Sequence, residues 1–405
     1  MEYDYTEKVI EHFSNPRNVG EISDADGVAT IGSEECGDMI KVWIKVANEY
    51  LADVKYKVFG CPAAIAACSM MTELAIGKHI DHAWELTDDH VAEALGGLPA
   101  SKYHCSNLSA SALHQAIMSY VTNSSVSSET ATVTILVDDI AYGNFRSEHG
   151  LSIWVECGNR RVLFDAGPND AVLKNAKLLG INLKQTDAIV LSHGHNDHAG
   201  GLEAVLNIAS NATIYLHPAA LEPKFSQKNG QVRKIGMSDS TKNLIGALAE
   251  NGKVVWTRKP TQVFPGLFVT GRIPRNSDFE DDGGAFFVDK NCHEPDLLPD
   301  DQALVLNMPK GTVVLLGCAH AGVINTLDYV AKLSRENHIS TVMGGMHLIN
   351  ASSERIEQTI GALGQFDVQR IGMAHCTGKD AVKRFRKAFP SRCFKCLAGT
   401  RVKFK

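Results

Sequence analysis

The order of polar and apolar positions in the first 120 residues predicts a domain of mixed α and β structure. Residues 41–47 and 53–59 alternate apolar and polar side chains, which is typical of paired strands with one exposed face. Residues 62–76 form an Ala-rich apolar run that predicts a buried helix. Further helices are expected at residues 5–13, 89–95 and 106–120. We therefore expect an α+β domain with a small antiparallel sheet and helices.

Strands and helices alternate along the rest of the chain in two series. The first series has strands at residues 132–137, 151–156, 161–164, 188–191 and 212–216 and a helix at 202–209. The second has strands at 303–306, 312–316, 340–343 and 370–373 and helices at 321–333, 352–363 and 379–389. The segments VECGNRRVLFDAG and LNMPKGTVVLLGCAHAG both read as hairpins that end in a polar, Gly-bounded loop. This loose duplication suggests a two-sheet sandwich with helices outside.

A polar stretch separates the two parts. Residues 122–130 read TNSSVSSET, which has no periodicity and the composition of a linker. The charge balance changes at the same place: residues 1–125 carry 8 Lys+Arg against 18 Asp+Glu, and the remainder carries 32 against 28. We expect one domain at residues 1–124, a linker at 125–131 and a second domain at 132–405. A chain of 405 residues is long enough to bury two such cores.

Composition restricts the class of protein. Hydrophobic residues make up 44% and charged residues 21% of the chain, which excludes disordered, collagen-like and coiled-coil classes. No stretch approaches the roughly 18 apolar residues of a membrane helix, and MEYDYTEKVI lacks the basic start of a secretory signal. We expect a cytoplasmic protein with no membrane partner. The basic segment 383–405 alternates charges with apolar residues, which favours a terminal helix and strand over a nucleic-acid site.

The segment IVLSHGHNDHAGGL carries the strongest signal for chemistry. It places His193, His195, Asp197 and His198 within six residues, directly after a strand. Imidazole and carboxylate groups suit Zn²⁺, Fe and Mn²⁺. His193 and His195 can converge on one ion, and Asp197 and His198 on a second. A His-rich surface loop is the alternative, but the strand and the following Gly pair fix the backbone and argue against it.

This HxHxDH motif resembles the metallo-β-lactamase superfamily, and the resemblance implies an αββα sandwich. It further implies that His320 in GCAHAG is the third ligand of the first metal and that His375 in MAHCTG is the last ligand of the second. Asp165 in FDAG would orient a ligand histidine. Many members bridge the two metals with an acidic residue, whereas the matching segment here reads VMGGMHL. His347 stands near that place, and we leave it open between a metal ligand and a core histidine.

The same resemblance implies metal-assisted hydrolysis by two divalent ions, Zn or Fe/Mn, about 3.5–4 Å apart. Asp197 would be both a ligand and the proton acceptor, and Asp165 would orient a ligand histidine from outside the set of ligands. The segments SEHGLSIWVE, GRIPR, DDQALVL and GGMHL resemble the pterin-type branch, labelled after the archaeal 7,8-dihydropterin-6-methyl-aminobenzene-phosphate synthase. That branch implies a small-molecule substrate and a phosphate-ester or phosphate-displacing reaction. His149, Cys318 and Cys376 either line the metal pocket or serve packing.

The cysteines of the first part suggest a second site. Ten cysteines in the chain point to thiol or metal chemistry rather than to a disulfide framework. Cys36, Cys61 and Cys105 each adjoin a Gly-flanked or polar turn, with Asp38 and His104 close in sequence. Such a set suits a Zn²⁺ ion or a labile Fe–S cluster, and buried inert thiols are the alternative. Cys61 is expected just before a helix, whose N-terminus lowers the pKa of a thiol.

The segments HFSNPRNVGE, CGD, FGCPAAIA and LPASKYHCSNL resemble the NifU/IscU-type Fe–S cluster scaffold family across residues 1–122. The resemblance implies that Cys36, Cys61 and Cys105 hold a nascent cluster, of the [2Fe–2S] type. It also implies that Asp38 keeps the cluster exchangeable and that His104 is an alternative ligand. Cysteine desulfurase or other Fe–S assembly proteins would be partners, and a homo-oligomer is compatible with the family. Pro62 after the second cysteine, and LPASK in place of LPPVK, depart from the family pattern.

Two functional hypotheses follow. The chain is either a metallo-hydrolase fused to an Fe–S scaffold, or chiefly an Fe–S carrier or redox protein whose second domain binds metal without turnover. Cys68 is expected in the core, and the pair Cys393 and Cys396 has no second pair nearby to complete a metal site. His217, His293 and His338 have no motif around them and are expected to be structural.

Overall fold

The structure is a computed structural model that describes residues 5–32, 38–123, 130–334 and 338–405. The chain divides into two compact units, residues 1–123 and 124–405. Most of the expected linker, residues 125–129, lies outside the described residues, and the first strand of the second unit already begins at Ala131. Within the described ranges, no helix is both long enough and apolar enough to cross a bilayer.

The first unit is built on one antiparallel sheet. Its strands are β1 (Gly27–Gly32), β2 (Met39–Ala47) and β3 (Tyr50–Phe59), in that order. A two-residue turn joins β2 to β3, and both turn residues, Asn48 and Glu49, have positive φ. This geometry matches the twist of a hairpin. The two expected strands are confirmed as β2 and β3, whereas β1 was not expected because its sequence, GVATIG, offers only a short alternation between two glycines.

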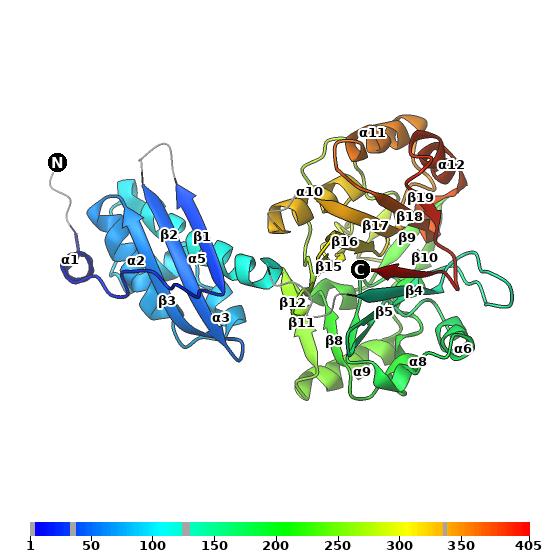
Figure 1. Cartoon of the computed structure of the whole chain (residues 1–405), viewed down its shortest axis with the longest axis horizontal. Coiled ribbons are helices and arrows are strands. Elements are labelled where there is room, and N and C mark those ends of the chain that lie inside the picture. Colours follow the sequence, from blue (N-terminus) through cyan, green and yellow to red (C-terminus); the bar gives the residue numbers. More distant parts are fainter. Residues whose placement is uncertain (1–4, 33–37, 124–129, 335–337) are drawn as a thin grey trace. The chain divides into compact units, whose positions relative to one another are not determined.

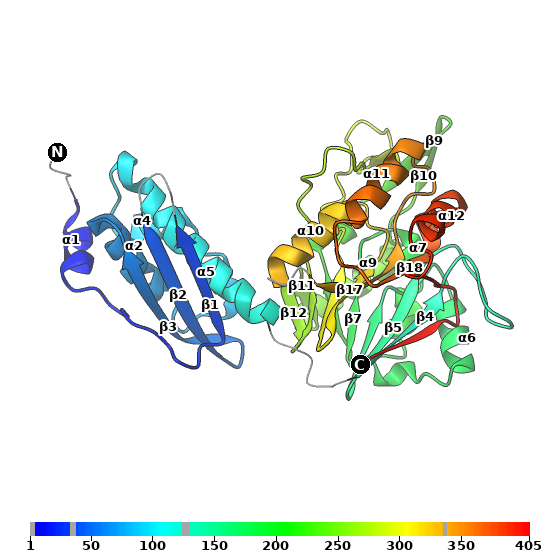
Figure 2. The same cartoon turned by 45° about the horizontal axis from the view of Figure 1, so that its top comes forward.

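Helices cover one face of this sheet (Figures 1 and 2). They are α1 (Glu7–Ser14), α2 (Pro62–Ala75), α3 (Ile80–Trp84), α4 (Asp88–Ala94), the 3₁₀ turn η1 (Ala100–Lys102) and α5 (Tyr103–Asn123). α5 contacts β1 and β2, while α2 lies against β3, α1, α4 and α5. Because α2 has neighbours on so many sides, ten of its residues are buried, which explains its nearly continuous apolar sequence. The expected α+β domain with a small sheet is confirmed.

The second unit contains two facing sheets of seven strands. In spatial order the first holds β11 (Val254–Trp256), β8 (Thr213–Leu216), β7 (Ala188–Val190), β6 (Arg160–Phe164), β5 (Ser152–Cys157), β4 (Ala131–Val137) and β20 (Arg401–Phe404). The second holds β12 (Thr261–Phe264), β13 (Leu267–Val269), β15 (Leu304–Met308), β16 (Gly311–Leu316), β17 (Ile339–Gly345), β18 (Arg370–Ala374) and β19 (Cys393–Lys395). Apolar side chains of both sheets, among them Val133, Phe164, Leu306 and Leu315, form one core between them.

Helices lie on the outer side of each sheet (Figures 1 and 2). Those by the first sheet are α6 (Ala171–Leu178), η2 (Leu183–Gln185), α7 (Asn196–Ala199), α8 (Leu202–Leu206), η3 (Pro218–Leu221) and α9 (Asp239–Glu250). Those by the second are α10 (Val323–Ser334), α11 (Ser353–Leu363), η4 (His375–Thr377) and α12 (Lys379–Ala388). A second core packs α6, α8 and α9 against the first sheet. The predicted two-sheet sandwich with outer helices is thereby confirmed, and α12 and β20 are the terminal helix and strand expected from the basic segment.

A third, three-stranded sheet was not expected. It consists of β10 (Gln231–Lys234), β9 (Phe225–Lys228) and β14 (Phe286–Phe287). The hairpin β9–β10 turns at Asn229-Gly230, where both residues have positive φ, as a two-residue hairpin turn requires. Its strands expose most of their side chains, so their sequence shows no alternation of buried and exposed positions. A strand pattern that depends on burial therefore cannot reveal them.

Candidate metal centres

The loop between β7 and α7 carries the histidine motif, and its backbone is tightly confined. A Cβ atom on Gly194 would lie 2.2 Å from the carbonyl oxygen of Ala220, so this position accepts only glycine. The neighbouring Gly200 is confined in the same way, because a Cβ there would lie 2.2 Å from the carbonyl oxygen of Pro168. His195 is the N-cap residue of α7, which places Asp197 in the first turn of that helix. The loop thus projects all four motif side chains from a fixed backbone.

The three histidines expected at the first metal lie together. The ring centroid of His193 is 4.6 Å from that of His195 and 4.8 Å from that of His320, and the rings of His195 and His320 are 4.9 Å apart. The Nε2 atom of His193 and the Nδ1 atom of His195 are only 3.1 Å apart. His320 follows β16 and therefore reaches this cluster from the opposite sheet.

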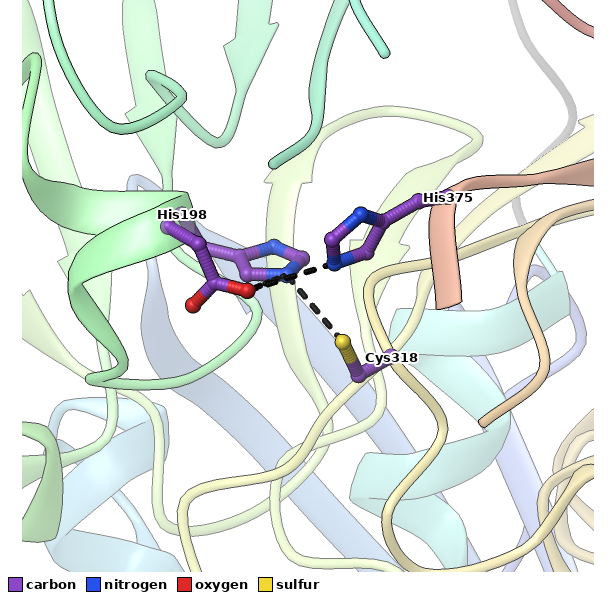
Figure 3. Close-up of side chains that lie close together, drawn as sticks. His198, Cys318 and His375 are labelled. Atoms are coloured by element: carbon purple, nitrogen blue, oxygen red, sulfur yellow. Dashed lines mark hydrogen bonds and ion pairs between the residues drawn. The ribbon is translucent and has the colours of Figure 1, made fainter. Parts of the chain in front are cut away.

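The residues expected at the second metal lie beside this cluster. Asp197 Oδ2 is 3.3 Å from His375 Nε2 and 3.9 Å from His198 Nε2. The ligand atoms of these three residues and the sulfur of Cys318 all lie within 4.8 Å of one another. Figure 3 shows the side chains of His198, Cys318 and His375 converging from three separate segments of the chain. The structure therefore brings the predicted second set together and adds a thiol to it.

Two observations show that this set of residues fits a metal. His195 Nε2 and His320 Nε2 are buried and have no hydrogen-bond partner among the described residues, a costly state for a buried polar atom unless something else binds there. Burial also lowers the pKa of His193 and His320 well below the usual range and that of His195 to about 4. These imidazoles are neutral at pH 7, which is the form that binds metals. Nitrogen, carboxylate and thiol donors in this number suit Zn²⁺ or Fe.

Asp165 fixes the orientation of one ligand histidine. Its Oδ2 atom accepts hydrogen bonds from His198 Nδ1 and from the Ser192 hydroxyl, both at 2.7 Å, and its Oδ1 atom accepts one from the Ser192 backbone N–H at 2.7 Å. With Nδ1 donating to Asp165, the Nε2 atom of His198 keeps its lone pair free to face the centre. This is the contact expected of a carboxylate that orients a ligand.

Two further carboxylates hold His375 in place, and the sequence analysis did not identify them. Asp139 Oδ1 accepts a hydrogen bond from His375 Nδ1 at 2.6 Å, and Asp138 Oδ1 accepts one from the His375 backbone N–H at 2.6 Å. Burial raises the pKa of Asp139, but hydrogen bonds from His149 and His375 outweigh it and hold that pKa below its usual range. His149 donates from an exposed position at the edge of the centre. The signal in the sequence was two adjacent acids directly after a strand, in VDDIAYG.

His347, which the sequence left open, lies at the side of the first cluster. Its ring centroid is 4.3 Å from that of His320, and its Nδ1 atom is buried without a partner in the described part of the chain. Its backbone N–H donates to the sulfur of Cys376 at 3.3 Å. The ligand atoms of Cys318, His347 and Cys376 lie within 4.8 Å of one another. His347 therefore lies beside the histidine cluster and not in the apolar core.

Two buried cysteines were left unassigned by the sequence and also belong to the centre. Cys318 Sγ is 3.1 Å from His198 Nε2 and 3.3 Å from Cys376 Sγ. Their sequence signal was proximity to ligand histidines, because Cys318 is two residues before His320 and Cys376 directly follows His375. Phe286 of β14 was missed as well: its ring lies 5.2 Å from the rings of both His195 and His320 and forms an apolar wall of the centre.

The predicted residues of the first unit meet at one end of α2. Cys61 is the N-cap residue of α2, and its Sγ is 3.6 Å from Cys105 Sγ. Cys105 Sγ is 3.7 Å from Asp38 Oδ2 and 3.4 Å from His104 Nε2. Asp38 Oδ1 accepts a hydrogen bond from the Cys61 backbone N–H at 3.3 Å. Cys36 lies outside the described residues, so the structure brings together four of the five predicted side chains.

The thiols of Cys61 and Cys105 differ in the direction in which their pKa values are shifted. The hydrogen bond from Cys105 lowers the pKa of Cys61, and the backbone N–H of Ala64 in the first turn of α2 adds to the effect. The same bond raises the pKa of the buried Cys105. Cys61 is half-buried, and His104 is exposed beside Cys105. Cys68 is fully buried further along α2, which confirms its expected place in the core.

Comparisons with known proteins identify families for both units. The NifU-like N-terminal domain family matches residues 4–126, and the metallo-beta-lactamase superfamily matches residues 147–367. The chain is 57% identical over 116 residues to the iron-sulfur cluster assembly scaffold protein IscU 1 of Archaeoglobus fulgidus, which is 29% of this chain and 76% of that protein.

The second unit has relatives of its own. The chain is 32% identical over 282 residues to 7,8-dihydropterin-6-methyl-4-(beta-D-ribofuranosyl)-aminobenzene-5'-phosphate synthase of Methanocaldococcus jannaschii, which is 67% of this chain and 95% of that protein. The solved structure of Tm1679, a metal-dependent hydrolase of the beta-lactamase superfamily, is 33% identical with a TM-score of 0.57 and covers 67% of this chain and 98% of its own. The chain therefore belongs to two families, joining a NifU-like N-terminal domain to a domain of the metallo-beta-lactamase superfamily.

Proposed function

We propose that the second unit is a hydrolase that uses two divalent metal ions, and that the first unit holds an Fe–S cluster for transfer. One observation carries the hydrolase proposal: two sets of ligand atoms share one buried centre, and His195 Nε2 and His320 Nε2 have no partner there among the described residues. Two such ions lower the pKa of a bound water and polarise a substrate oxygen.

The protein's own groups have distinct tasks in this proposal. His198 and His375 present their Nε2 atoms because Asp165 and Asp139 accept hydrogen bonds from the opposite ring nitrogens. Asp197 accepts the proton of the attacking water. Its side chain is 20% exposed, whereas those of His198 and His375 are almost fully buried, so it is the group of this set that an incoming water meets. Phe286 excludes bulk water from one side of the centre.

The substrate proposal is a phosphate ester of a small cyclic molecule. A cavity of about 300 Å³ is lined by Arg272, Arg275 and Asp282. One of its lining residues contacts the centre: the carbonyl oxygen of Asp282 accepts a hydrogen bond from His320 Nδ1 at 3.1 Å, while the Asp282 carboxylate pairs with Arg275. Guanidinium groups bind phosphate oxygens well, and Phe286 offers an aromatic surface nearby. The similarity to the pterin-linked phosphate synthase supports the same class of substrate.

A hydrolysis assay tests this proposal. The full chain, purified without oxygen and with its metals quantified, is assayed on a panel of phosphate monoesters and diesters. His195→Ala should reduce turnover by more than about 100-fold, since loss of an outer partner alone costs 10–100-fold. His338→Ala is the matched control, because the ring of that half-exposed histidine contacts the carbonyl oxygen of Lys310 and the carboxylate of Asp367. Absence of hydrolysis on every ester, or equal rates for both variants, contradicts the hydrolase proposal.

The cluster proposal for the first unit rests on the thiols of Cys61 and Cys105 beside Asp38 and His104. A cysteine desulfurase or another assembly protein would supply the sulfide. Anaerobic reconstitution with iron and sulfide should give a visible Fe–S spectrum in the full chain. Cys105→Ala should lower bound iron and acid-labile sulfide severalfold, whereas Cys292→Ser, a half-buried cysteine of the second unit, should not. Equal sulfide in both variants contradicts the proposal.

The buried thiols of Cys318 and Cys376 favour one second candidate. Thiolates also suit iron, so the second unit could bind iron without turnover, and the whole chain would then be an Fe–S carrier or redox protein. Iron in both units combined with no hydrolysis would select this candidate. Zinc in the second unit with hydrolysis that depends on His195 would exclude it.

A further inference from the structure

Cys318 occupies a position common to the two sets of metal ligands. Its sulfur lies within 4.8 Å of the ligand atoms of His193 and His320 in the first set, and within the same distance of those of Asp197, His198 and His375 in the second. Its distance from His198 Nε2 is 3.1 Å, and Figure 3 shows its side chain directed between His198 and His375. Cys318 is 2% exposed, so its sulfur faces these ligands and not solvent.

We propose that the Cys318 thiolate bridges the two ions of the metal centre. This inference rests on the metal centre of the proposed function and deepens it. The dimensions allow such a bridge. A Zn–S bond of about 2.3 Å on each side spans up to about 4.6 Å, which exceeds the separation of about 3.5–4 Å in two-metal sites. On metal binding the thiol proton leaves to solvent, and the sulfur binds both ions.

The surroundings of Cys318 hold its sulfur in place. The thiol of Cys376 donates to the Cys318 sulfur at 3.3 Å and contacts its carbonyl oxygen at 3.7 Å. Cys376 in turn accepts the backbone N–H of His347 at 3.3 Å. A Cβ on Gly345 would lie 2.7 Å from the Cys376 sulfur, so the absence of a side chain there makes room for it. Cys376 is therefore a positioning residue, and Cys318 is the ligand.

A thiolate bridge makes a chemical prediction about metal choice. Soft sulfur ligands favour Zn²⁺ and Fe over Mn²⁺ and Mg²⁺, which prefer oxygen. We therefore expect the centre to discriminate against Mn²⁺ more strongly than a centre bridged by a carboxylate. Cys318→Asp should supply an oxygen donor in place of the sulfur and relax this discrimination.

X-ray absorption at the zinc edge gives the decisive measurement. The full chain carries Cys36→Ser, Cys61→Ser and Cys105→Ser, so that thiols of the first unit contribute no zinc–sulfur signal, and reductant keeps the remaining thiols free. It is loaded with zinc, and the metal is counted by mass spectrometry. A bridging sulfur is bound to both ions and therefore gives an average of one sulfur per zinc at about 2.3 Å. A thiolate on one ion gives half a sulfur per zinc.

The expected result is two zinc ions per chain with one sulfur per zinc, and no sulfur in Cys318→Asp. The bridge is overturned, and a metal centre remains, if the parent chain gives half a sulfur or no sulfur per zinc. The same holds if the sulfur signal is lost in Cys376→Ser but kept in Cys318→Asp. Absence of bound zinc overturns the metal centre itself. Cys396→Ser, a buried cysteine of β19's end with no contact to the ligands, is the control and should leave the sulfur count unchanged. If Cys318→Asp does not fold, Cys376→Ser decides: one sulfur per zinc that persists in that variant supports the bridge by Cys318, and a fall to half a sulfur per zinc overturns it.

Discussion

The side-chain carboxylate of Asp300 accepts a hydrogen bond from the backbone N–H of Gly194 at 2.8 Å, across 106 positions of the sequence. The other oxygen of Asp300 binds the ammonium group of Lys224 at 3.0 Å, and Lys224 also binds Asp296 at 2.8 Å. All three side chains are almost fully buried. Burial lowers the pKa of Lys224, but the two carboxylates outweigh this and raise it above its usual value. A buried charged triad thus supports the backbone of the histidine loop.

Removal of the cation from this triad should be strongly destabilising. Lys224→Met leaves two buried carboxylates without their partner, and breaking a buried ion pair in this way costs about 3–5 kcal/mol. The measurement is urea unfolding of the full chain, monitored by hydrogen exchange in peptides of β5 and β6. Lys234→Met removes the cation of an exposed pair with Asp239 and should change little. Equal free energies of unfolding for the two variants would show that the triad does not stabilise the fold.

The hydrogen bond from His198 to Asp165 should appear in the metal affinity. Asp165→Asn keeps the shape of the side chain but removes the negative charge of the group that accepts the hydrogen bond from His198 Nδ1. We expect zinc to bind about 10–100-fold more weakly, as is typical when an outer partner of a ligand histidine is lost. Competition with a chromophoric chelator measures the affinity. Asp170→Asn, at an exposed carboxylate paired with Lys174, is the control, and equal affinities for the two variants would contradict the orienting role.

The confinement of the histidine loop gives a third prediction. Gly194→Ala places a Cβ 2.2 Å from a backbone oxygen, which no side-chain rotation can relieve, so the loop must move. We expect the variant to lose zinc binding and to unfold at lower urea concentration. Gly246→Ala is the control, because nothing lies within 4 Å of a Cβ at that position in α9. That variant should be slightly more stable, by up to about 1 kcal/mol. Full zinc occupancy in Gly194→Ala would contradict the prediction.

The residues that the sequence identified in the second unit lie within short motifs next to strands. His193 to His198, His320 and His375 each follow a strand that can be recognised by its own apolar pattern. Asp139 lies just after β4, but no local pattern shows that it pairs with His375, which is 236 positions away. Asp300 is likewise 106 positions from its partner Gly194. Only the pairing of strands within the two sheets brings such residues together. Local patterns therefore predict which loops carry the site but not which charged groups stand behind them.

The same limit applies to the fold. Strands with a buried face, such as β4 and β16, were predicted because burial imposes a pattern on the sequence. The hairpin β9–β10 has two exposed faces and so has no such pattern, although its Asn229-Gly230 turn was a local signal. Helix α3 has only five residues, which is too short for a helical period to show. Sequence patterns predicted the layers, but elements outside the two cores required the structure.

A buried histidine of the first unit should make its stability depend on pH. His12 of α1 is 3% exposed, its Nδ1 is 2.9 Å from the Ser69 hydroxyl, and Glu73 lies 3.7 Å from its Nε2. Burial lowers the pKa of His12, and this outweighs the opposite effect of Glu73. The unfolded chain, with a histidine pKa of about 6.5, therefore binds more protons than the folded chain as the pH falls below that value. The free energy of unfolding of the first unit must therefore decrease as the pH falls.

Hydrogen exchange in peptides of α1 and α2, corrected for the intrinsic effect of pH on exchange, measures this dependence in the full chain. We expect protection to decrease as the pH falls below about 6.5. His12→Gln retains a polar side chain that can bind the Ser69 hydroxyl but cannot titrate, so its protection should depend less on pH. His90→Gln, at an exposed histidine of α4, is the control and should keep the dependence of the parent chain. An identical pH dependence in the parent and in His12→Gln would contradict the prediction, because groups other than His12 would then set it.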